Sequence, residues 1–422
     1  MDWSYYNPVA IHAGMGALKQ LPPYLASLGN LLLVTSPGMV RRGSAAELIN
    51  TVEGEGILAE KALNAAFTSE GKEITIVDLP LAQKNVRQKN ISQNLEKRGR
   101  KWFVATIGPN PDVITLESLI RELRGKDSGK IEGIVALGGG SVMDSAKVLA
   151  VGLADNTDNA DNTDDAGLAS WDICYYFSHH NEAALALPYF CVPTTSGTGA
   201  EVTPFGTVWD TEAKKKYSFS AQNLFATAAF LDPSTTLSLP PKETLYGALD
   251  ALSHSLETLW NHNSSTMGQT FARKAITLVC EAYPAVEANP FDIDARQCLQ
   301  EASMLAGLAI SQSRSALAHS MSYPLTSHFG VPHGLACSFT LPAIIEVVTQ
   351  KGLWRHKEDE MLAMKAKNFM RGLTLPKHVA EYCAADDVFA LADEMFAPGR
   401  VENFIVPITS DEVLALLRKS LG

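Results

Sequence analysis

The sequence predicts an α/β lobe built on a parallel sheet, followed by an all-α lobe. The chain has 422 residues, which is long enough for two domains that each bury a core. In the first half, short apolar runs alternate with helical stretches, as in a doubly wound parallel sheet. From about Pro240 onward the pattern changes to helical periods. The break at Leu239-Pro240-Pro241 therefore predicts a sheet domain at 1–239 and a helical domain at 240–422.

Three apolar runs in the first half predict buried parallel strands, because each run ends at turn residues. The runs are 31–35, 102–107 and 134–137, and the last one leads into Gly138-Gly139-Gly140. In a doubly wound sheet, ligands bind beyond the carboxyl ends of the strands. We therefore expect the glycine-rich turns to lie at the ligand edge of the sheet.

Two segments of the first half do not fit this alternation. Residues 54–100 predict an inserted element that includes a strand-like run at 74–77. Residues 155–166 are acidic and of low complexity, with almost nothing to bury, so they predict a mobile surface loop. We assign no chemistry to either segment. In the second half, the helical period predicts helices at 242–260, 267–287 and 295–313.

Composition limits the class of partner. A net charge of −11 and a single short lysine run, Lys214-Lys215-Lys216, argue against a nucleic-acid partner. No uninterrupted apolar stretch reaches the ~18 residues that span a bilayer, and the first residues lack the basic and apolar regions of a leader. Six cysteines without CxxC pairing indicate reduced, mostly buried thiols. We therefore expect a cytoplasmic protein with a small-molecule ligand, no membrane partner, and cysteines that take no part in the chemistry.

The turn Gly138-Gly139-Gly140-Ser141 follows a predicted strand and precedes a predicted helix, which is a context suited to a dinucleotide. Glycines allow a pyrophosphate to approach the backbone, Ser141 can cap the helix, and the helix N-terminus favours negative charge. The turn lacks the usual GxGxxG pattern. A plain strand-to-helix connection is therefore an equal alternative.

A second loop, from Pro193 to Glu201, concentrates hydroxyls and glycines in the sequence PTTSGTGAE. Its donors suit a ribose or a phosphate, since a structural turn does not require so many of them. The alternative is a threonine-rich helix cap, which involves no ligand.

Four side chains predict a metal site in the second half. Asp250 and His254 lie four residues apart, which places both on one face of a helix and within reach of one ion. Such a pair alone is more often a surface hydrogen bond. His319 and His333 lie among small and apolar residues, where a histidine needs a partner or a metal. One carboxylate and three imidazoles suit Fe²⁺ or Zn²⁺, whereas Ca²⁺ and Mg²⁺ prefer oxygen ligands.

Four features together resemble the iron-dependent (group III) alcohol dehydrogenase family. They are GGGSVMDSAK at 138–147, PTTSGTGAEVT at 193–203, GALDALSHSLE at 247–257, and the pair His319 and His333. The likeness extends from Asn7 to about Gly334 and weakens in the C-terminal helices. The resemblance implies a Rossmann-like N-terminal domain, a helical C-terminal domain, an active site in the cleft between them, and a homodimer.

The resemblance also implies a role for each matched residue. The implied ligands of one Fe²⁺ or Zn²⁺, through which catalysis acts, are Asp250, His254, His319 and His333. A nicotinamide cofactor, NAD(H) or NADP(H), is implied at a second set of residues. These implied cofactor residues are Ser36, Gly139, Gly140, Ser141, Asp144, Thr194, Thr195, Thr198, Thr203 and Lys216. For Lys216, a solvated charge shared with its neighbouring lysines is the alternative.

Two positions differ from the family pattern. Members that prefer NAD often have an acidic residue after the first strand, where it bonds the ribose hydroxyls, and the matching residue here is Ser36. Both NAD(H) and NADP(H) therefore stay open. Many members have a histidine four residues after the third metal ligand, and this chain has Tyr323 there. A proton relay through that position does not follow from the sequence.

The resemblance implies a metal-dependent alcohol dehydrogenase or aldehyde reductase, in which a hydride passes between the nicotinamide and a metal-polarised carbonyl. The segments at 203–210 and 319–334 are similar to a branch that reduces phosphonoacetaldehyde, where Lys214, Lys215 or Arg314 would meet the phosphonate. A short-chain alcohol or diol dehydrogenase is the main alternative. More distant ones are a glycerol-1-phosphate dehydrogenase, a dehydroquinate synthase type of lyase, and a non-catalytic binding protein on this fold.

Overall fold

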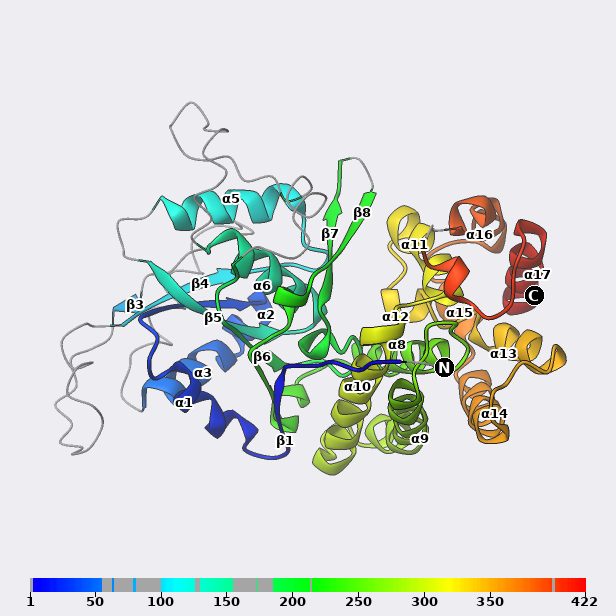
Figure 1. Cartoon of the computed structure of the whole chain (residues 1–422), viewed down its shortest axis with the longest axis horizontal. Helices are drawn as coiled ribbons and strands as arrows, with labels where there is room; N and C mark the ends of the chain where they lie inside the picture. The colour runs from blue at the N-terminus through cyan, green and yellow to red at the C-terminus, as the bar shows by residue number, and fades with distance from the viewer. Residues whose placement is uncertain are drawn as a thin grey trace.

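The computed structural model describes residues 3–54, 63, 79–80, 100–125, 130–154, 173, 185–212, 215–396 and 399–422. These residues form a sheet lobe from the first half of the chain and a helical lobe from the second, as predicted (Figure 1). The strand-like run at 74–77, most of the predicted insertion, the acidic segment 155–166 and Lys214 lie outside the described residues. In the part of the chain that is described, no helix combines the length and apolar character that a membrane crossing requires.

The sheet lobe contains, within the described residues, a sheet of seven strands in the order β1-β9-β6-β5-β2-β4-β3. Neighbouring strands are parallel except for β3 and β4. The strands are β1 (Ala10–Ala13), β2 (Asn30–Thr35), β3 (Leu79–Pro80), β4 (Lys101–Thr106), β5 (Ile131–Gly138), β6 (Tyr189–Pro193) and β9 (Ala228–Leu231). The strands predicted from the apolar runs are confirmed as β2, β4 and β5.

Helices cover both faces of this sheet (Figure 1). One face carries α1 (Leu21–Leu25) and α3 (Ser44–Glu53), and the other carries α5 (Val113–Arg124) and α6 (Gly140–Gly152). Successive residues of β2 enter different cores, since Leu31 packs with α1 and α3 whereas Leu32 packs with α5 and α6. The strand is therefore buried on both faces, as in a doubly wound sheet.

The helical lobe begins with α8 (Pro241–Leu259), next to the predicted domain boundary between residues 239 and 240, which stays a prediction. The other predicted helices are confirmed as α9 (Thr266–Ala288) and α10 (Ile293–Ser313), and all three contribute to one apolar core. The α-helices that follow are α11 (Leu317–Phe329), α12 (His333–Ala336), α13 (Leu341–Gln350), α14 (Lys357–Gly372), α15 (Leu375–Val379), α16 (Ala385–Ala390) and α17 (Ser410–Leu421).

A hairpin that the sequence pattern did not predict stands at the boundary between the sheet lobe and the helical lobe (Figure 1). It consists of β7 (Phe205–Asp210) and β8 (Lys215–Ser220), which pair antiparallel. Asp144 on α6 fixes the hairpin, because its Oδ2 accepts a hydrogen bond from the backbone N of Thr207 at 2.9 Å. The hairpin places Lys216, one of the predicted cofactor residues, in the space between the lobes.

Glycines allow the loop after β6 to touch the helical lobe. A Cβ added at Gly197 would lie 2.6 Å from the Cα of Gly247 on α8. A Cβ added at Gly199 would lie 2.4 Å from the Cα of Gly307 on α10. Gly199 also has a φ of 59°, a left-handed conformation that disfavours residues with a side chain. Side chains at these positions would therefore push the loop of residues 194–199, here called the threonine loop, away from the helices.

We expect Gly199→Ala to lower the free energy of unfolding by about 2–4 kcal/mol, because the methyl group would meet helix backbone and the φ would be strained. Gly330→Ala is the matched control, since Gly330 has a φ of 67° and no described atom lies within 4 Å of its Cβ position. Only the backbone penalty of about 1–2 kcal/mol applies there. Urea unfolding of both variants measures the difference, and equal losses would contradict the close contact with α10.

Candidate active site

A cavity of about 880 Å³ is lined by residues of both lobes. It brings together every residue that the sequence predicted for the site. The predicted metal ligands that line it are Asp250, His254, His319 and His333. The predicted cofactor residues that line it are Ser36, Gly139, Gly140, Ser141, Asp144, Thr194, Thr195, Thr198, Thr203 and Lys216. The loops of the sheet lobe therefore share one cavity with the histidines of the helical lobe, while the role of each residue stays a prediction.

Three histidine nitrogens surround one carboxylate oxygen, Oδ1 of Asp250. The Nε2 atom lies 3.5 Å away for His254 and 3.7 Å away for both His319 and His333. These distances are too long for hydrogen bonds. They are close to the ~3.4 Å edges of a tetrahedron whose ligand atoms lie ~2.1 Å from one ion. Oδ1 of Asp250 therefore lies at a suitable distance from each of the three histidine nitrogens to share one divalent cation with it.

His319 has a free nitrogen of the kind that a metal ion needs. Its Nδ1 donates a hydrogen bond to Oε2 of Glu257 at 2.7 Å, which leaves the lone pair of Nε2 available. That Nε2 is buried and has no hydrogen-bond partner among the described residues. Buried polar atoms are rarely left without a partner, and histidines that bind metals typically donate their other ring N–H to a carboxylate. The residues present therefore fit a metal ion.

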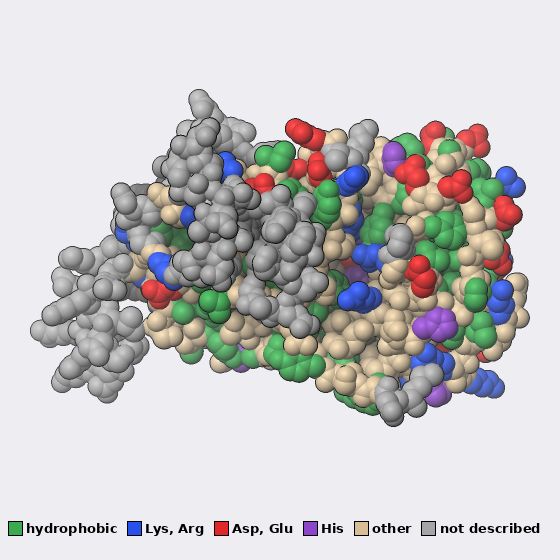
Figure 2. Space-filling model, turned by 45° about the horizontal axis from the view of Figure 1, so that its top comes forward, with side chains coloured by type: hydrophobic (Ala, Val, Ile, Leu, Met, Phe, Trp, Pro, Cys, Tyr) green, Lys and Arg blue, Asp and Glu red, His purple; other side chains and the backbone are tan. Residues whose placement is uncertain are grey.

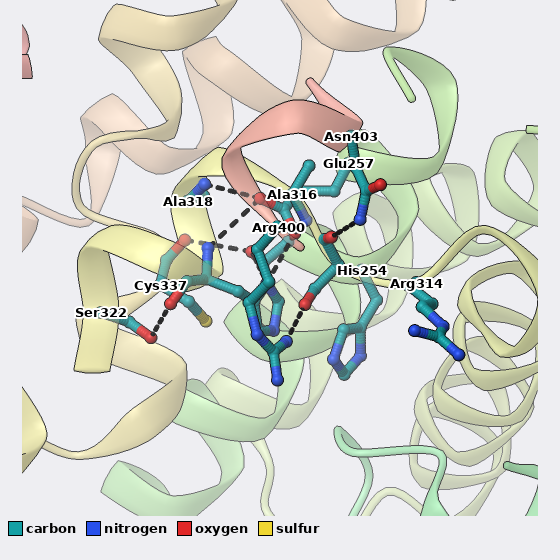
Figure 3. Close-up of polar contacts among 12 residues, drawn as sticks. His254, Glu257, Arg314, Ala316, Ala318, Ser322, Cys337, Arg400 and Asn403 are labelled. Atoms are coloured by element: carbon teal, nitrogen blue, oxygen red, sulfur yellow. Dashed lines mark hydrogen bonds and ion pairs between the residues drawn. The ribbon is translucent and has the colours of Figure 1, made fainter. Parts of the chain in front are cut away.

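Glu257 connects two of the helices that supply the predicted ligands. From α8 it accepts hydrogen bonds from backbone N–H groups at the start of α11, at 2.8 Å from Ala316 and 2.6 Å from Ala318 (Figure 3). Burial raises the pKa of its carboxyl, but His319 and the backbone N–H groups of Ala316 and His319 outweigh burial, and the net pKa is lowered. Glu257 is thus ionised and holds His319 in place. Its role was not predicted from the sequence, although Glu257 lies three residues after His254 on the same helix face.

Burial and charge favour an ionised carboxylate at Asp250 and neutral imidazoles at His254 and His333. Burial lowers the pKa of His254, and burial lowers the pKa of His333 further below its usual range. Burial raises the pKa of the Asp250 carboxyl, but the surrounding histidines outweigh it and the net pKa is well below its usual range. For His319, burial lowers the pKa, but Glu257 and Asp250 outweigh it and the net pKa is raised. The ionised carboxylate and the lone pairs of His254 and His333 suit a cation, and an ion bound at His319 would displace a proton from its Nε2.

Cys337 also lies beside these residues, although the sequence analysis gave the cysteines no part in the chemistry. The Sγ of Cys337, a carboxylate oxygen of Asp250 and one ring nitrogen each of His319 and His333 all lie within 4.8 Å of one another. Its Sγ lies 3.6 Å from Oδ1 of Asp250. Burial raises the pKa of the thiol well above its usual range, so Cys337 stays protonated and donates a hydrogen bond. The group of mutually close ligand atoms contains Cys337 and not His254, so His254 as the fourth ligand stays a prediction from the sequence.

The glycine turn after β5 packs against the threonine loop after β6. A Cβ added at Gly139 would lie 2.9 Å from Cγ2 of Thr195, and one added at Gly140 would lie 2.8 Å from Cγ2 of Thr198. The N-cap of α6 is Gly139 and no side chain caps the helix, so the prediction that Ser141 caps it is wrong. Ser141 lies inside the first turn of the helix. No side chain therefore competes with an anion for the first N–H groups of α6.

Asp144 and Thr203 have a shared partner that the sequence analysis missed. Lys147 on α6 is fully buried, and its Nζ lies 3.3 Å from Oδ1 of Asp144 and 3.4 Å from Oγ1 of Thr203. It also donates to the backbone O of Phe205 at 2.5 Å. A buried ammonium requires such partners. These contacts fix α6 to the hairpin, and direct contacts of Asp144 and Thr203 with a cofactor stay predictions.

Ser36 follows β2 and caps the short helix α2 (Pro37–Arg41), where its Oγ accepts a hydrogen bond from the backbone N of Met39 at 3.4 Å. Arg41 and Arg42 line the same cavity. A Cβ added at Gly38 would lie 3.0 Å from Nη1 of Arg42, so this guanidinium lies over the start of α2. The surroundings of Ser36 are therefore basic.

Tyr323, at the position where many family members have histidine, lies beside two cations. The centre of its ring is 4.2 Å from Nζ of Lys216 and 4.7 Å from the guanidinium carbon of Arg400. Burial raises the pKa of Tyr323 to about 12, so its hydroxyl keeps its proton near neutral pH. Burial, and next the charge of Arg400, lower the pKa of Lys216 to about 7. Lys216 thus belongs to this cluster and is not a solvated surface charge.

The basic residues suggested for a phosphonate have different positions. Arg314 lines the cavity, Lys215 is exposed and does not line it, and Lys214 lies outside the described residues. Figure 2 shows Lys and Arg side chains along the boundary between the two lobes. Arg400 lines the cavity as well, and the sequence analysis missed it because it lies where the family likeness is weak.

This arrangement of a doubly wound lobe, a helical lobe and a cluster of three histidines around an aspartate is that of a two-lobe oxidoreductase. The family model for iron-containing alcohol dehydrogenase matches residues 59–233, and the model for the C-terminal part of the Fe-containing alcohol dehydrogenase family matches residues 244–421. The chain belongs to the iron-containing alcohol dehydrogenase family, whose members are oxidoreductases.

Individual relatives match different shares of this chain. Phosphonoacetaldehyde reductase from Streptomyces viridochromogenes is 34% identical over 239 residues, which are 56% of this chain and 58% of that protein. Alcohol dehydrogenase 4 from Saccharomyces cerevisiae is 27% identical over 382 residues, which are 87% of this chain and 95% of that protein. The structure of sulfoacetaldehyde reductase from Bifidobacterium kashiwanohense in complex with NAD⁺ has a TM-score of 0.73 at 24% identity, covering 100% of this chain and 99% of that one. This last likeness shows the fold.

Proposed function

We propose that this protein reduces a small aldehyde to the alcohol, and catalyses the reverse oxidation, with a bound divalent metal and NAD(H) or NADP(H). The observation that supports this proposal is the approach of three histidine Nε2 atoms to Oδ1 of Asp250 at 3.5–3.7 Å. The same cavity is lined by the loops after β5 and β6. A bound Fe²⁺ or Zn²⁺ would polarise the carbonyl oxygen, and the nicotinamide would exchange a hydride with the carbonyl carbon.

The residues of the chain have separate tasks in this proposal. Asp250 and the three histidines hold the ion, and Glu257 orients His319. The uncapped start of α6 favours the pyrophosphate of the cofactor, while the threonine loop lines the path from there to the histidines. Tyr323 keeps its proton, since burial raises its pKa to about 12, and its hydroxyl can donate a hydrogen bond.

For the substrate we propose phosphonoacetaldehyde, with 2-hydroxyethylphosphonate as the alcohol. The partial match to phosphonoacetaldehyde reductase supports this choice, and so does Arg314 at the cavity wall, because a guanidinium binds phosphonate oxygens well. A short-chain alcohol or diol dehydrogenase is the second candidate, supported by the longer match to alcohol dehydrogenase 4. We also propose a homodimer, from the family resemblance, which light scattering of the purified protein would test.

The test begins with anaerobic metal analysis of the purified protein. NADH and NADPH oxidation is then followed with phosphonoacetaldehyde and propanal, before and after chelation and after Fe²⁺ or Zn²⁺ is restored. We expect one metal per chain, loss of turnover on chelation, and recovery with one of the two ions. Turnover that survives complete removal of metal would overturn the proposal. An occupied metal site without turnover of any aldehyde would redirect the search to the lyase and phosphate-substrate alternatives.

Ser36 tests the choice of cofactor, for which we propose NADP(H), because the cavity beside it contains Arg41 and Arg42 and no acidic residue follows β2. Ser36→Asp would repel the 2′-phosphate and bond the ribose hydroxyls. We expect the ratio of kcat/KM for NADPH over NADH to fall by about 10²-fold, which corresponds to ~2.7 kcal/mol.

Ser36→Asn is the matched control for this variant. Asn and Asp are equally good helix caps and similar in size, so both keep α2 intact, but Asn adds no charge. We expect Ser36→Asn to leave the cofactor ratio within a few-fold of the original. If both variants shift the ratio equally, the effect comes from local structure and the electrostatic explanation is wrong.

A further inference from the structure

Three basic side chains line the cavity beside the predicted metal ligands and come from separate parts of the chain. They are Lys216 on β8, Arg314 at the end of α10, and Arg400 between α16 and α17. Among the described residues, none of the three forms an ion pair with a carboxylate within 4.0 Å. The two guanidinium groups are charged at neutral pH and attract an anion into the cavity, and a bound anion would favour the protonated form of Lys216.

Arg400 is held in a fixed orientation by neutral partners. One amino group of its guanidinium donates to Oγ of Ser315, and the other donates to Oγ of Ser218 at 3.1 Å. Its guanidinium also lies 4.7 Å from the ring centre of Tyr323. These contacts position the planar group and do not neutralise its charge. The remaining N–H groups of the guanidinium are left for a ligand, since an arginine has five donors.

Arg314 adopts a backbone conformation that residues with a side chain rarely occupy. Its φ is 62°, and its carbonyl O accepts a hydrogen bond from Nδ2 of the buried Asn261 at 2.9 Å. Such strain persists only where the surrounding structure enforces it, and it is common at functional sites. Ser315, the partner of Arg400, is the next residue in the chain. The strained turn therefore presents one arginine to the cavity and anchors the other.

Both arginines line the same cavity as the predicted metal ligands. Figure 3 shows the guanidinium groups of Arg400 and Arg314 extending to the same side as the imidazole of His254, and all three line the cavity. Tyr323, which packs against Arg400, lies four residues after His319 on α11, which is a rise of ~6 Å along the helix. A substrate whose anionic group binds these arginines while its carbonyl group lies at the metal site would therefore need only a short chain between the two groups.

We propose that Arg400 and Arg314, with Lys216, bind a tetrahedral oxyanion at the end of the substrate opposite its carbonyl group. The inference rests on the proposed aldehyde reductase function and adds the residues that select the substrate. Phosphonate and sulfonate share the required chemistry, because a guanidinium donates two parallel hydrogen bonds to either group. The pyrophosphate of the cofactor is assigned to the start of α6, which leaves the arginines for the substrate.

The experiment compares Arg400→Met and Arg314→Met with the original protein, each loaded with metal. Steady-state constants are measured for phosphonoacetaldehyde, sulfoacetaldehyde and propanal. We expect kcat/KM for the preferred anionic aldehyde, relative to that for propanal, to fall by about 10²-fold in each variant. Arg371→Met is the matched control, because Arg371 is exposed and lies outside the cavity, and it should change no constant. Arg400→Lys keeps the positive charge but cannot donate two parallel hydrogen bonds, so it should give an intermediate fall in kcat/KM for the anionic aldehyde.

Binding provides a second readout that does not depend on turnover. Calorimetry with 2-hydroxyethylphosphonate and with 2-hydroxyethylsulfonate shows which oxyanion is preferred, and both methionine variants should lose that binding. An equal fall for propanal and the anionic aldehydes, or a change confined to the KM of the cofactor, would overturn the proposed subsite. If the original protein reduces propanal but shows no preference for anionic aldehydes, the subsite is refuted while the reductase function stands. If no aldehyde is reduced at all, it is the reductase function that fails.

Discussion

Asp250→Asn is expected to lose the metal ion and to lower kcat/KM by about 10³-fold or more, since a Lewis-acid metal supplies several kcal/mol of transition-state stabilisation. Oδ1 of Asp250 is the atom that the three histidine nitrogens surround. The amide of Asn is neutral and similar in size. It removes the charge that offsets the cation while leaving the packing of α8 nearly unchanged, so the loss reports on the metal.

The measurement for Asp250→Asn is metal content after dialysis, together with kcat/KM at saturating Fe²⁺ or Zn²⁺. Asp386→Asn is the matched control, because Asp386 is an exposed acidic residue on α16 that does not line the cavity. It should retain both metal and activity. A variant at Asp250 that keeps one metal per chain and normal turnover would show that the cluster is not the metal site.

Glu257→Gln is expected to weaken metal binding by about 10–100-fold, the usual effect of removing the partner of a ligating histidine. The carboxylate of Glu257 accepts hydrogen bonds from Nδ1 of His319 and from the backbone N of Ala316 and Ala318 at 2.6–2.8 Å. The amide of Gln would place N–H groups against some of these donors. His319 would then lose the contact that fixes its proton on Nδ1, and the start of α11 would be less stable.

Competition between the protein and a chelator of known affinity measures this effect, and urea unfolding measures the change in stability. Glu281→Gln is the control, since Glu281 is exposed and pairs with Lys365 at 2.8 Å away from the cavity. Excess metal should restore part of the lost turnover in Glu257→Gln, because the ligands themselves remain. If Glu257→Gln binds metal as tightly as the original protein, Glu257 has only a structural role.

The apolar pattern was enough to predict the class of fold. The runs at 31–35, 102–107 and 134–137 form β2, β4 and β5. They could be recognised in the sequence because a strand buried on both faces is a nearly continuous run of apolar residues. The hairpin of β7 and β8 was not predicted. Its second strand, KKYSFS, is partly exposed and polar, so its pairing depends on contacts with the rest of the lobe and not on its own pattern.

The residues of the candidate site were named from the sequence by local spacing and by family resemblance. Asp250 and His254 share a helix face because four residues make about one turn. The partner of His319 could not be found in this way, because Glu257 lies 62 residues earlier in the chain. The tertiary structure alone brings these two side chains together.

The sequence by itself determined a sheet lobe, a helical lobe and membership of a metal-dependent oxidoreductase family, because hydrophobic periodicity and short motifs are local properties of the chain. Only the tertiary structure decided which side chains support the predicted ligands and which cations share their cavity. Arg400 meets Tyr323, and Lys147 meets Thr203, across segments far apart in sequence. Such contacts depend on how α-helices and loops pack in three dimensions, and no spacing within one segment encodes them.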